Sequence, residues 1–147
     1  MLDSEKFLEE RIEHIVEQAW NKGHVDALDD VLLTDFVYKA PLGVDLEGLE
    51  AFKQHILSMR IAYPDLHVEV NETTLDQEHN TVFSEWTFEG TNVGDSEFMG
   101  HPVTGKKLLF NGVSLLHIED DQYVDESVYY DALEVMQQLG LVPEMAA

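Results

Sequence analysis

Cysteine is absent from the 147-residue chain, which excludes disulfides, thiol catalysis and cysteine-ligated metals. Basic side chains are scarce: 8 Lys and Arg stand against 30 Asp and Glu, a formal net charge of −22. Such a chain repels phosphate backbones and anionic membrane surfaces, so we expect no nucleic-acid partner and no membrane partner. No apolar run approaches the roughly 20 residues that span a bilayer, and the N-terminal segment is acidic where a secretory signal is basic and then apolar. We therefore predict a soluble, cytoplasmic protein.

The rest of the composition is that of a folded protein. Hydrophobic residues make up 44% of the chain and aromatic residues 10%, enough apolar surface to offset the entropy lost on chain ordering. The length predicts one domain, spanning residues 1–147, with a single substantial core. The acidity has two open interpretations: a surface adapted to high salt, or a solubility device on an ordinary enzyme.

Apolar side chains at helical spacing predict three helices in the first half of the chain. The first helix spans about residues 3–21, ends before Gly23, and buries one stripe of side chains: Leu8, Ile12, Ile15, Val16, Ala19 and Trp20. A short second helix is predicted over 25–33. A third is predicted over 49–63, where Pro64 ends it.

Farther along the chain, apolar side chains alternate with a period of two, which predicts strands. The predicted strands span residues 35–39, 66–75, 81–91, 107–119 and 123–130, and a closing helix spans 131–139. In the strand over 81–91, Val82, Ser84, Trp86 and Phe88 share one face. This order predicts an α+β fold, a cone-shaped curved antiparallel sheet with three N-terminal helices packed on it and a short C-terminal helix.

Four passages of the sequence resemble one family. They are NKGHVDAL at 21–28 with DF at 35–36, EG at 47–48 through AYPDL at 62–66, EGT at 89–91 with FMGHPVTGK at 98–106, and YDAL at 130–133 with QQLG at 137–140. By these motifs the chain resembles the SnoaL-like polyketide cyclases, also called ester cyclases, of the nuclear transport factor 2-like superfamily. The resemblance covers residues from about 15 to 140 and implies the cone fold.

The resemblance also implies an activity and two catalytic residues. In cyclases of this kind an aspartate that opens the closing segment is the general acid/base, and it corresponds to Asp131. His117, on the preceding strand, corresponds to a second polar group of the site. The implied reaction is an intramolecular aldol ring closure on an aromatic polyketide ester, which needs no metal because the conjugated substrate delocalises the enolate. The sequence departs from the family pattern at Ser127, where tryptophan is common, and at Asn92 and Lys39, where histidine is common.

From the residues alone, Asp131 has two interpretations. It stands at a strand-to-helix boundary, where Asp is a preferred N-cap. Alternatively it faces the cone interior, where apolar neighbours would raise its pKa into a range useful for acid/base catalysis. Asn111 and His117 share one strand face unless Gly112 introduces a bulge. If that face is inward, Asn111 orients a carbonyl and His117 relays a proton; otherwise His117 is a surface or core-edge histidine.

Six further residues are candidates for substrate contact. His101 lies in a Gly-His-Pro loop, and the others are aromatic or apolar: Trp86, Tyr38, Phe52, Met59 and Tyr129. Each is also compatible with an ordinary place in the core or, for His101, on an exposed loop. In a cone, however, the wall of the pocket is the open side of the core. These residues predict a small apolar or aromatic carbonyl-containing molecule as the partner.

The sequence lacks the motifs of metal-dependent, phosphate-binding and serine-hydrolase chemistry. The sequence has no His-x-x-x-His or Glu-x-x-His pair, no glycine-rich phosphate loop and no Gly-x-Ser-x-Gly, so we expect no metal and no cofactor. Two alternatives to the cyclase stay open: a cone that binds a small apolar ligand without catalysis, and a ketosteroid isomerase-like enzyme that transfers a proton without ring closure. An epoxide hydrolase is disfavoured, because Arg11 and Arg60 both lie in predicted helices. The resemblance further implies a homodimer or higher homo-oligomer that pairs through the open sheet face.

Overall fold

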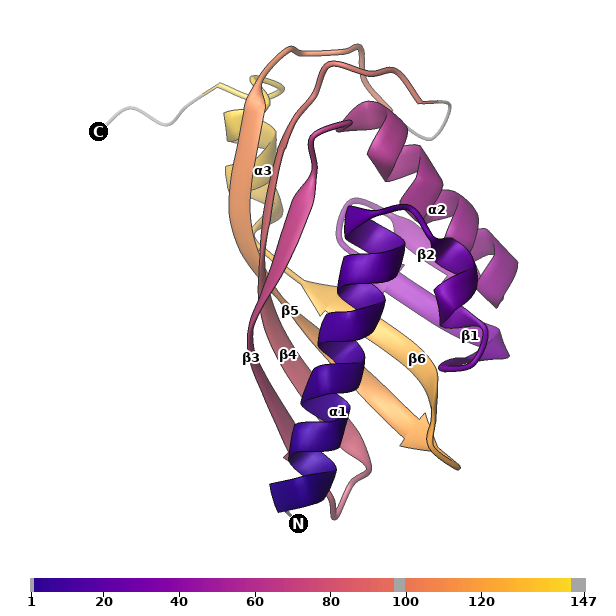
Figure 1. Ribbon diagram of the computed structural model, residues 1–147. Helices are drawn as coiled ribbons and strands as arrows, with labels where there is room; N and C mark the ends of the chain where they lie inside the picture. The colour runs from indigo at the N-terminus through magenta and orange to yellow at the C-terminus, as the bar shows by residue number, and fades with distance from the viewer. Residues whose placement is uncertain (1, 97–99, 144–147) are drawn as a thin grey trace.

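Six strands form one curved sheet in the order β2-β1-β6-β5-β4-β3 (Figure 1). The computed structural model describes residues 2–96 and 100–143, so Phe98 and Met99 of the loop motif lie outside the described residues. The strands are β1 (Leu32–Ala40), β2 (Val44–Glu47), β3 (His67–Asp76), β4 (Thr81–Thr91), β5 (Lys107–Glu119) and β6 (Gln122–Tyr129). The mixed α+β cone predicted from the sequence is confirmed.

The sheet differs from the prediction in two respects, both at β1. Strand β1 pairs in parallel with β6, while the other neighbouring strands pair antiparallel. The short strand β2 is not predicted from the sequence, because four residues carry too little alternation to be recognised. Gly43 and Gly48, on either side of β2, have φ angles of +82° and +98°. These left-handed conformations suit glycine and turn the chain into and out of the strand.

Helices α1 and α2 cover one face of the sheet, and α3 packs against the end of β5 (Figure 1). Helix α1 (Leu2–Ile15) continues without a break into a π-helical segment, η1 (Val16–Asn21), so together they match the predicted first helix. Helices α2 (Leu49–Ala62) and α3 (Ala132–Gln138) also match.

The second predicted helix, over 25–33, is wrong in extent. Only a 3₁₀ turn, η2 (Val25–Leu28), forms there. Leu32 already belongs to β1, where it is opposite Tyr123 of β6. The buried Leu28 is part of the core in either case, so the apolar spacing did not separate a helix from a turn followed by a strand.

The core lies between the sheet and the helices. The expected inward face of β4 is confirmed, since Val82 and Phe88 are buried in the core and Ser84 and Trp86 line the interior. Even-numbered residues of β5, from Leu108 to Leu116, share this side of the sheet because β4 and β5 pair in one continuous register. Odd-numbered residues of both strands therefore lie on the outer face.

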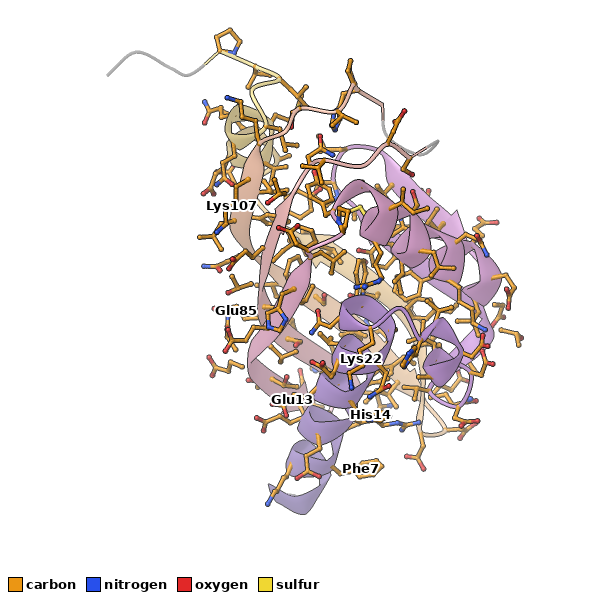
Figure 2. All side chains as sticks on the ribbon, turned by 45° about the horizontal axis from the view of Figure 1, so that its top comes forward. Phe7, Glu13, His14, Lys22, Glu85 and Lys107 are labelled. Carbon is orange, nitrogen blue, oxygen red and sulfur yellow. The ribbon has the colours of Figure 1, made fainter. Side chains whose placement is uncertain are left out.

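Charged side chains gather on the outside of the molecule, as Figure 2 shows for Glu13, Glu85 and Lys107. Lys53 is an exception, because its side chain is buried on α2 and its Nζ lies 3.0 Å from Asp26 and 2.5 Å from Asp29 of the η2 segment. Among residues 2–96 and 100–143, no helix is long and apolar enough to cross a membrane.

Candidate functional site

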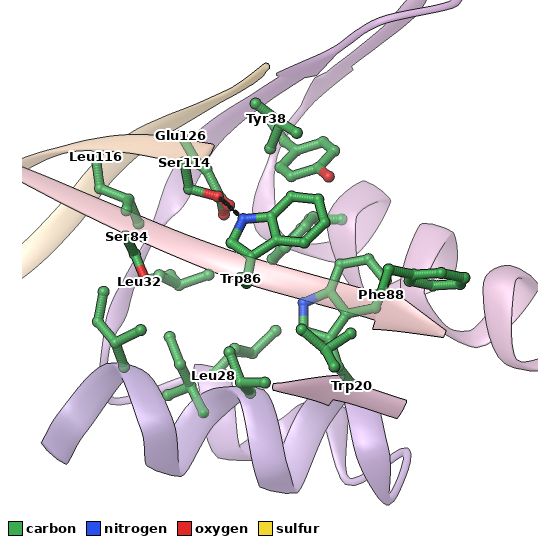
Figure 3. A pocket seen from close by; sticks show the side chains of 16 residues that line it. Trp20, Leu28, Leu32, Tyr38, Ser84, Trp86, Phe88, Ser114, Leu116 and Glu126 are labelled. Atoms are coloured by element: carbon green, nitrogen blue, oxygen red, sulfur yellow. Dashed lines mark hydrogen bonds between the residues drawn. The ribbon is translucent and has the colours of Figure 1, made fainter. Parts of the chain in front are cut away.

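Two adjoining hollows lie between the sheet and the helices. We call the smaller one the inner chamber; it has a volume of about 80 Å³ and is shown in Figure 3. Its walls are Ile12, Ile15, Val16, Trp20, Leu28, Leu32, Tyr38, Phe52, Val68, Ser84, Trp86, Phe88, Ser114, Leu116, Glu126 and Val128.

The larger hollow, the outer chamber, has a volume of about 710 Å³ and lies between α2, α3, β2 and the end of β5. The two chambers meet at residues that line both: Trp20, Tyr38, Trp86, Phe88 and Val128. Ligand pockets of small-molecule proteins typically measure about 300–1,000 Å³ and are mostly apolar. The outer chamber has the size and the lining of such a pocket.

A single carboxyl group lies in the wall of the inner chamber. Glu126 occupies the inward side of β6, between Leu116 of β5 and Tyr38 of β1 in the strand register. The Ser114 hydroxyl donates a hydrogen bond of 2.6 Å to Glu126 Oε2, and Trp86 Nε1 donates one of 2.9 Å to Ser114 Oγ. This relay from indole to hydroxyl to carboxylate, drawn as dashed lines in Figure 3, fixes the orientation of the carboxyl group.

Burial dominates the electrostatics of Glu126. Loss of hydration raises its pKa to about 7, and the hydrogen bond from Ser114 opposes this only in part. No Lys or Arg is among the residues that line either chamber in the described part of the chain. A carboxyl whose pKa lies near neutral pH can accept a proton in one step of a reaction and return it in a later one.

Tyr38 lies next to Glu126 on the neighbouring strand β1. It is the Cα partner of Glu126 in the β1–β6 register, and burial, followed by the Glu126 charge, raises its pKa well above its usual value. Its ring packs against Phe52, with 4.6 Å between ring centroids, and against His55 at 5.5 Å. The phenol stays protonated at neutral pH and can act only as a neutral hydrogen-bond donor or acceptor.

His55, in the wall of the outer chamber, is a further group whose pKa is shifted. Burial lowers its pKa to about 4, so its imidazole is neutral at pH 7. The described residues contain no group of three or more His, Asp or Glu that could hold a metal ion.

Gly112 explains how Trp86 reaches Ser114. A Cβ atom at this position would lie 2.4 Å from the Trp86 ring, which real Cβ atoms do not tolerate. Glycine therefore leaves room for the indole to lie across β5 and to direct Nε1 at Ser114. The bulge that Gly112 could have introduced does not form in the β4–β5 pair, whose register is continuous there. The irregularity lies between His117 and Ile118, in the pairing of β5 with β6.

The structure brings five of the predicted site residues to the chambers. Tyr38 and Trp86 line both chambers, Phe52 lines the inner one, and Met59 and His101 line the outer one. Their helices and strands are far apart in sequence, so only the closed cone assembles them. Their role in substrate binding stays a prediction.

The structure places the other four elsewhere. Asp131 is an exposed N-cap of α3, where its Oδ1 accepts a 3.1 Å hydrogen bond from the backbone N–H of Glu134. His117 and Asn111 are exposed on the outer face of β5, and Tyr129 is 62% exposed on β6. None of the four lines a chamber. The geometry thus matches the capping interpretation of Asp131, and its catalytic role stays a prediction without a structural contact behind it.

Sequence reasoning missed Glu126 and Ser114. A signal was present, because Glu126, Val128 and Tyr130 alternate along one strand and Ser114 alternates with Leu116. Glu126 did not stand out among the 30 acidic residues, because a chain with a net charge of −22 must keep nearly all of them on its surface. A local bulge also changes the parity of β6, since both Tyr123 and Glu126 face inward.

A curved sheet closed by helices around an apolar cavity is the cone fold of the nuclear transport factor 2-like and ketosteroid isomerase-like proteins. The family model of the SnoaL-like polyketide cyclases matches residues 10–139. The chain belongs to this family.

Solved structures agree with the fold. TsrD from Streptomyces laurentii is 23% identical, with a TM-score of 0.78, and the match covers 92% of this chain and 96% of that one. A protein from Jannaschia sp. CCS1 named for the SnoaL-like polyketide cyclases is 21% identical, with a TM-score of 0.77 and coverage of 91% and 92%. A protein of ketosteroid isomerase-like fold from Catenulispora acidiphila DSM 44928 is 17% identical, with a TM-score of 0.66 and coverage of 85% and 88%. A search of curated proteins found no match.

Proposed function

We propose that the protein is an acid/base enzyme that takes a proton from a carbon next to a carbonyl group, with Glu126 as the general base. The observation that carries the proposal is a partly buried carboxyl in the wall of a largely apolar chamber, with its pKa raised to about 7. Family membership favours intramolecular aldol ring closure as the overall reaction, and several structural relatives are named for polyketide cyclases. The substrate is then a small apolar or aromatic molecule with at least two carbonyl groups.

The proposed reaction begins and ends with Glu126 as a carboxylate. A Glu126 carboxylate oxygen takes the proton, and the electron pair of the broken C–H bond forms an enolate whose charge rests on the carbonyl oxygen. The enolate carbon then attacks a second carbonyl of the same molecule and forms the new C–C bond. The protonated Glu126 returns its proton to the resulting alkoxide, which regenerates the carboxylate.

Tyr38 is suited to stabilise the enolate. It neighbours Glu126 across the sheet, lines both chambers, and keeps its hydroxyl proton because its pKa is raised. A hydrogen bond from a fixed donor in a water-poor site stabilises developing negative charge more than it would in water. In an isomerase the same pair of residues would return the proton to a different carbon, so ring closure depends on the substrate that fills the outer chamber.

Hydrogen–deuterium exchange tests the proton-transfer step without knowledge of the natural substrate. The probe is ethyl 2-methyl-3-oxo-3-phenylpropanoate, an aromatic β-keto ester with one exchangeable α-hydrogen, followed by proton NMR in D₂O. We expect Glu126→Gln to slow the enzyme-dependent exchange by about 10²–10⁴-fold, the usual contribution of a general base. Asp131→Asn should change the rate less than twofold, and asparagine keeps the N-cap of α3.

Binding measured in parallel separates the alternatives. Both tryptophans of the chain line the chambers, so quenching of their fluorescence reports ligand affinity. Exchange lost in Glu126→Gln with affinity retained supports the proposed base. Exchange lost only in Asp131→Asn transfers the role to the aspartate that the family resemblance implies. Binding without enzyme-dependent exchange in the wild type identifies a non-catalytic ligand-binding cone.

The expected homodimer or higher homo-oligomer stays a prediction. The outer face of the sheet carries exposed apolar side chains that such an interface would cover: Phe83, Leu109, Val113 and Tyr129.

A further inference from the structure

The two chambers differ in the size of group that they admit. A cavity of about 150 Å³ in a protein core is known to bind benzene, whereas the inner chamber measures about 80 Å³. By proportion the inner chamber has room for roughly three carbon atoms of an apolar group and not for an aromatic ring. The outer chamber, at about 710 Å³, accommodates a fused ring system.

The wall of the inner chamber also favours apolar groups over polar ones. Beyond the Ser84, Ser114 and Glu126 side, the wall consists of aromatic and aliphatic side chains, and the aliphatic ones include Ile15 of α1 and Leu28 of η2. These aliphatic side chains have no hydrogen-bonding group to hold a water molecule or a polar substituent. An apolar group that entered would gain contacts with them and displace no strongly bound water.

The position of Glu126 fixes which part of a ligand faces which chamber. Tyr38 and Trp86 stand where the chambers meet, while Glu126 belongs to the inner chamber alone. A ligand whose carbonyl oxygen lies beside Tyr38, where the chambers meet, can direct its α-carbon into the inner chamber, toward Glu126. Atoms beyond that α-carbon then extend toward Ile15 and Leu28.

We propose that the inner chamber is a specificity pocket for a short alkyl chain, so that the ligand class is an aromatic ketone or ester that carries a side chain of up to about three carbons on its carbonyl group. The ring system occupies the outer chamber and the alkyl chain occupies the inner one. The position of the carbonyl rests on the proposed function. The alkyl pocket itself is tested by binding alone.

A series of alkyl phenyl ketones measures the depth of the pocket. The probes run from acetophenone through propiophenone, butyrophenone and valerophenone to hexanophenone, and the readout is quenching of tryptophan fluorescence. We expect dissociation constants to fall about fourfold per added methylene up to butyrophenone. Beyond butyrophenone the dissociation constants should level off or rise, because the fourth carbon no longer fits. We call the chain length at which affinity stops increasing the break in the series.

Two variants enlarge the pocket from different elements. Leu28→Ala, on η2, should move the break in the series to a longer chain. Ile15→Val, on α1, removes a single methylene and should tighten the binding of valerophenone relative to butyrophenone. Circular dichroism shows whether Leu28→Ala folds. If it does not, the smaller substitution Ile15→Val still tests the pocket. Met136→Ala is the matched control, because Met136 lines only the outer chamber; it should alter all five affinities together and leave the break in place.

Three results would overturn the alkyl pocket: a steady rise in affinity with no break, a break that neither enlarging variant moves, or no binding of any ketone up to its solubility limit. The series repeated on Glu126→Gln keeps this inference apart from the proposed function. A break that persists in Glu126→Gln supports the pocket whether or not proton exchange depends on Glu126.

Discussion

Asp125 and Glu126 are adjacent acidic residues of one strand, yet the two faces of the sheet give them opposite properties. On the outer face, the Asp125 carboxylate lies 2.7 Å from His117 Nδ1, and both side chains are well exposed to water. On the inner face, Glu126 is enclosed by apolar walls, receives one hydrogen bond from Ser114, and has its pKa raised to about 7. Residue type alone therefore does not identify the reactive carboxyl of this protein. The side of the sheet decides it, because only the inner side removes the carboxyl from water.

The largest effect expected from this contrast is a pH-dependent gain in the free energy of unfolding of Glu126→Gln. The folded-state pKa of Glu126 is about 7 against an ordinary 4.5, so between these values the folded state holds a proton that the unfolded state has released. The contribution is fully present below pH 4.5 and is lost as pH rises through 7, about 3 kcal/mol in all. Glutamine does not titrate, so the variant should gain about 3 kcal/mol over the wild type between pH 4.5 and pH 8.

Urea unfolding of both proteins across this range measures the gain. His55 titrates in the opposite sense: its lowered pKa of about 4 makes its contribution to stability fall as pH decreases from 6.5 toward 4. Because His55 is present in both proteins, the difference between them isolates Glu126. A difference that stays constant with pH would show that the carboxyl is solvated. Asp125→Asn, on the outer face of the same strand, is unfolded in parallel as the matched control.

A smaller effect is expected from Gly112→Ala, which disturbs the relay on the inner face. The added Cβ would lie 2.4 Å from the Trp86 ring, so the indole must move and its hydrogen bond to Ser114 is lost. Overpacking of this kind costs about 1–3 kcal/mol. We expect a loss of stability in urea together with a changed tryptophan emission spectrum.

Val113→Ala is the control for this substitution, since Val113 is the next residue and is 37% exposed on the outer face. It should leave tryptophan emission unchanged. An unchanged emission spectrum in Gly112→Ala as well would show that the indole does not depend on the space over Gly112.

The smallest effect is expected on the outer face. Asp125→Asn removes the partner of His117, but exposed ion pairs contribute only about 0.2–1 kcal/mol and are screened by salt. We expect a loss within that range at low ionic strength and almost none in concentrated NaCl, measured by urea unfolding. A loss that salt leaves unchanged would mean that the pair stabilises the protein through the bulge between His117 and Ile118.

Local patterns in the sequence determined much of the fold. The helical stripe from Leu8 to Trp20, the stop at Pro64 and the alternation of Val82, Ser84, Trp86 and Phe88 all depend on neighbours within a few residues. Such patterns predict elements and their apolar faces because helix and strand periodicities are local. The family motifs extended this to the cone as a whole, and the model match over residues 10–139 agrees.

Only the tertiary structure decided the candidate site. It paired β1 with β6 in parallel, which brought Tyr38 beside Glu126, and it enclosed Glu126 while leaving Asp131 as an exposed cap. These outcomes depend on contacts between segments some ninety residues apart, and on a bulge that reverses the alternation within β6. The sequence by itself determined most of the helices and strands and their apolar faces, but not β2 or the turn and strand that replace the helix predicted over 25–33. The choice of one carboxyl among thirty acidic residues required the closed cone, since burial is a property of the assembled molecule and not of the local pattern.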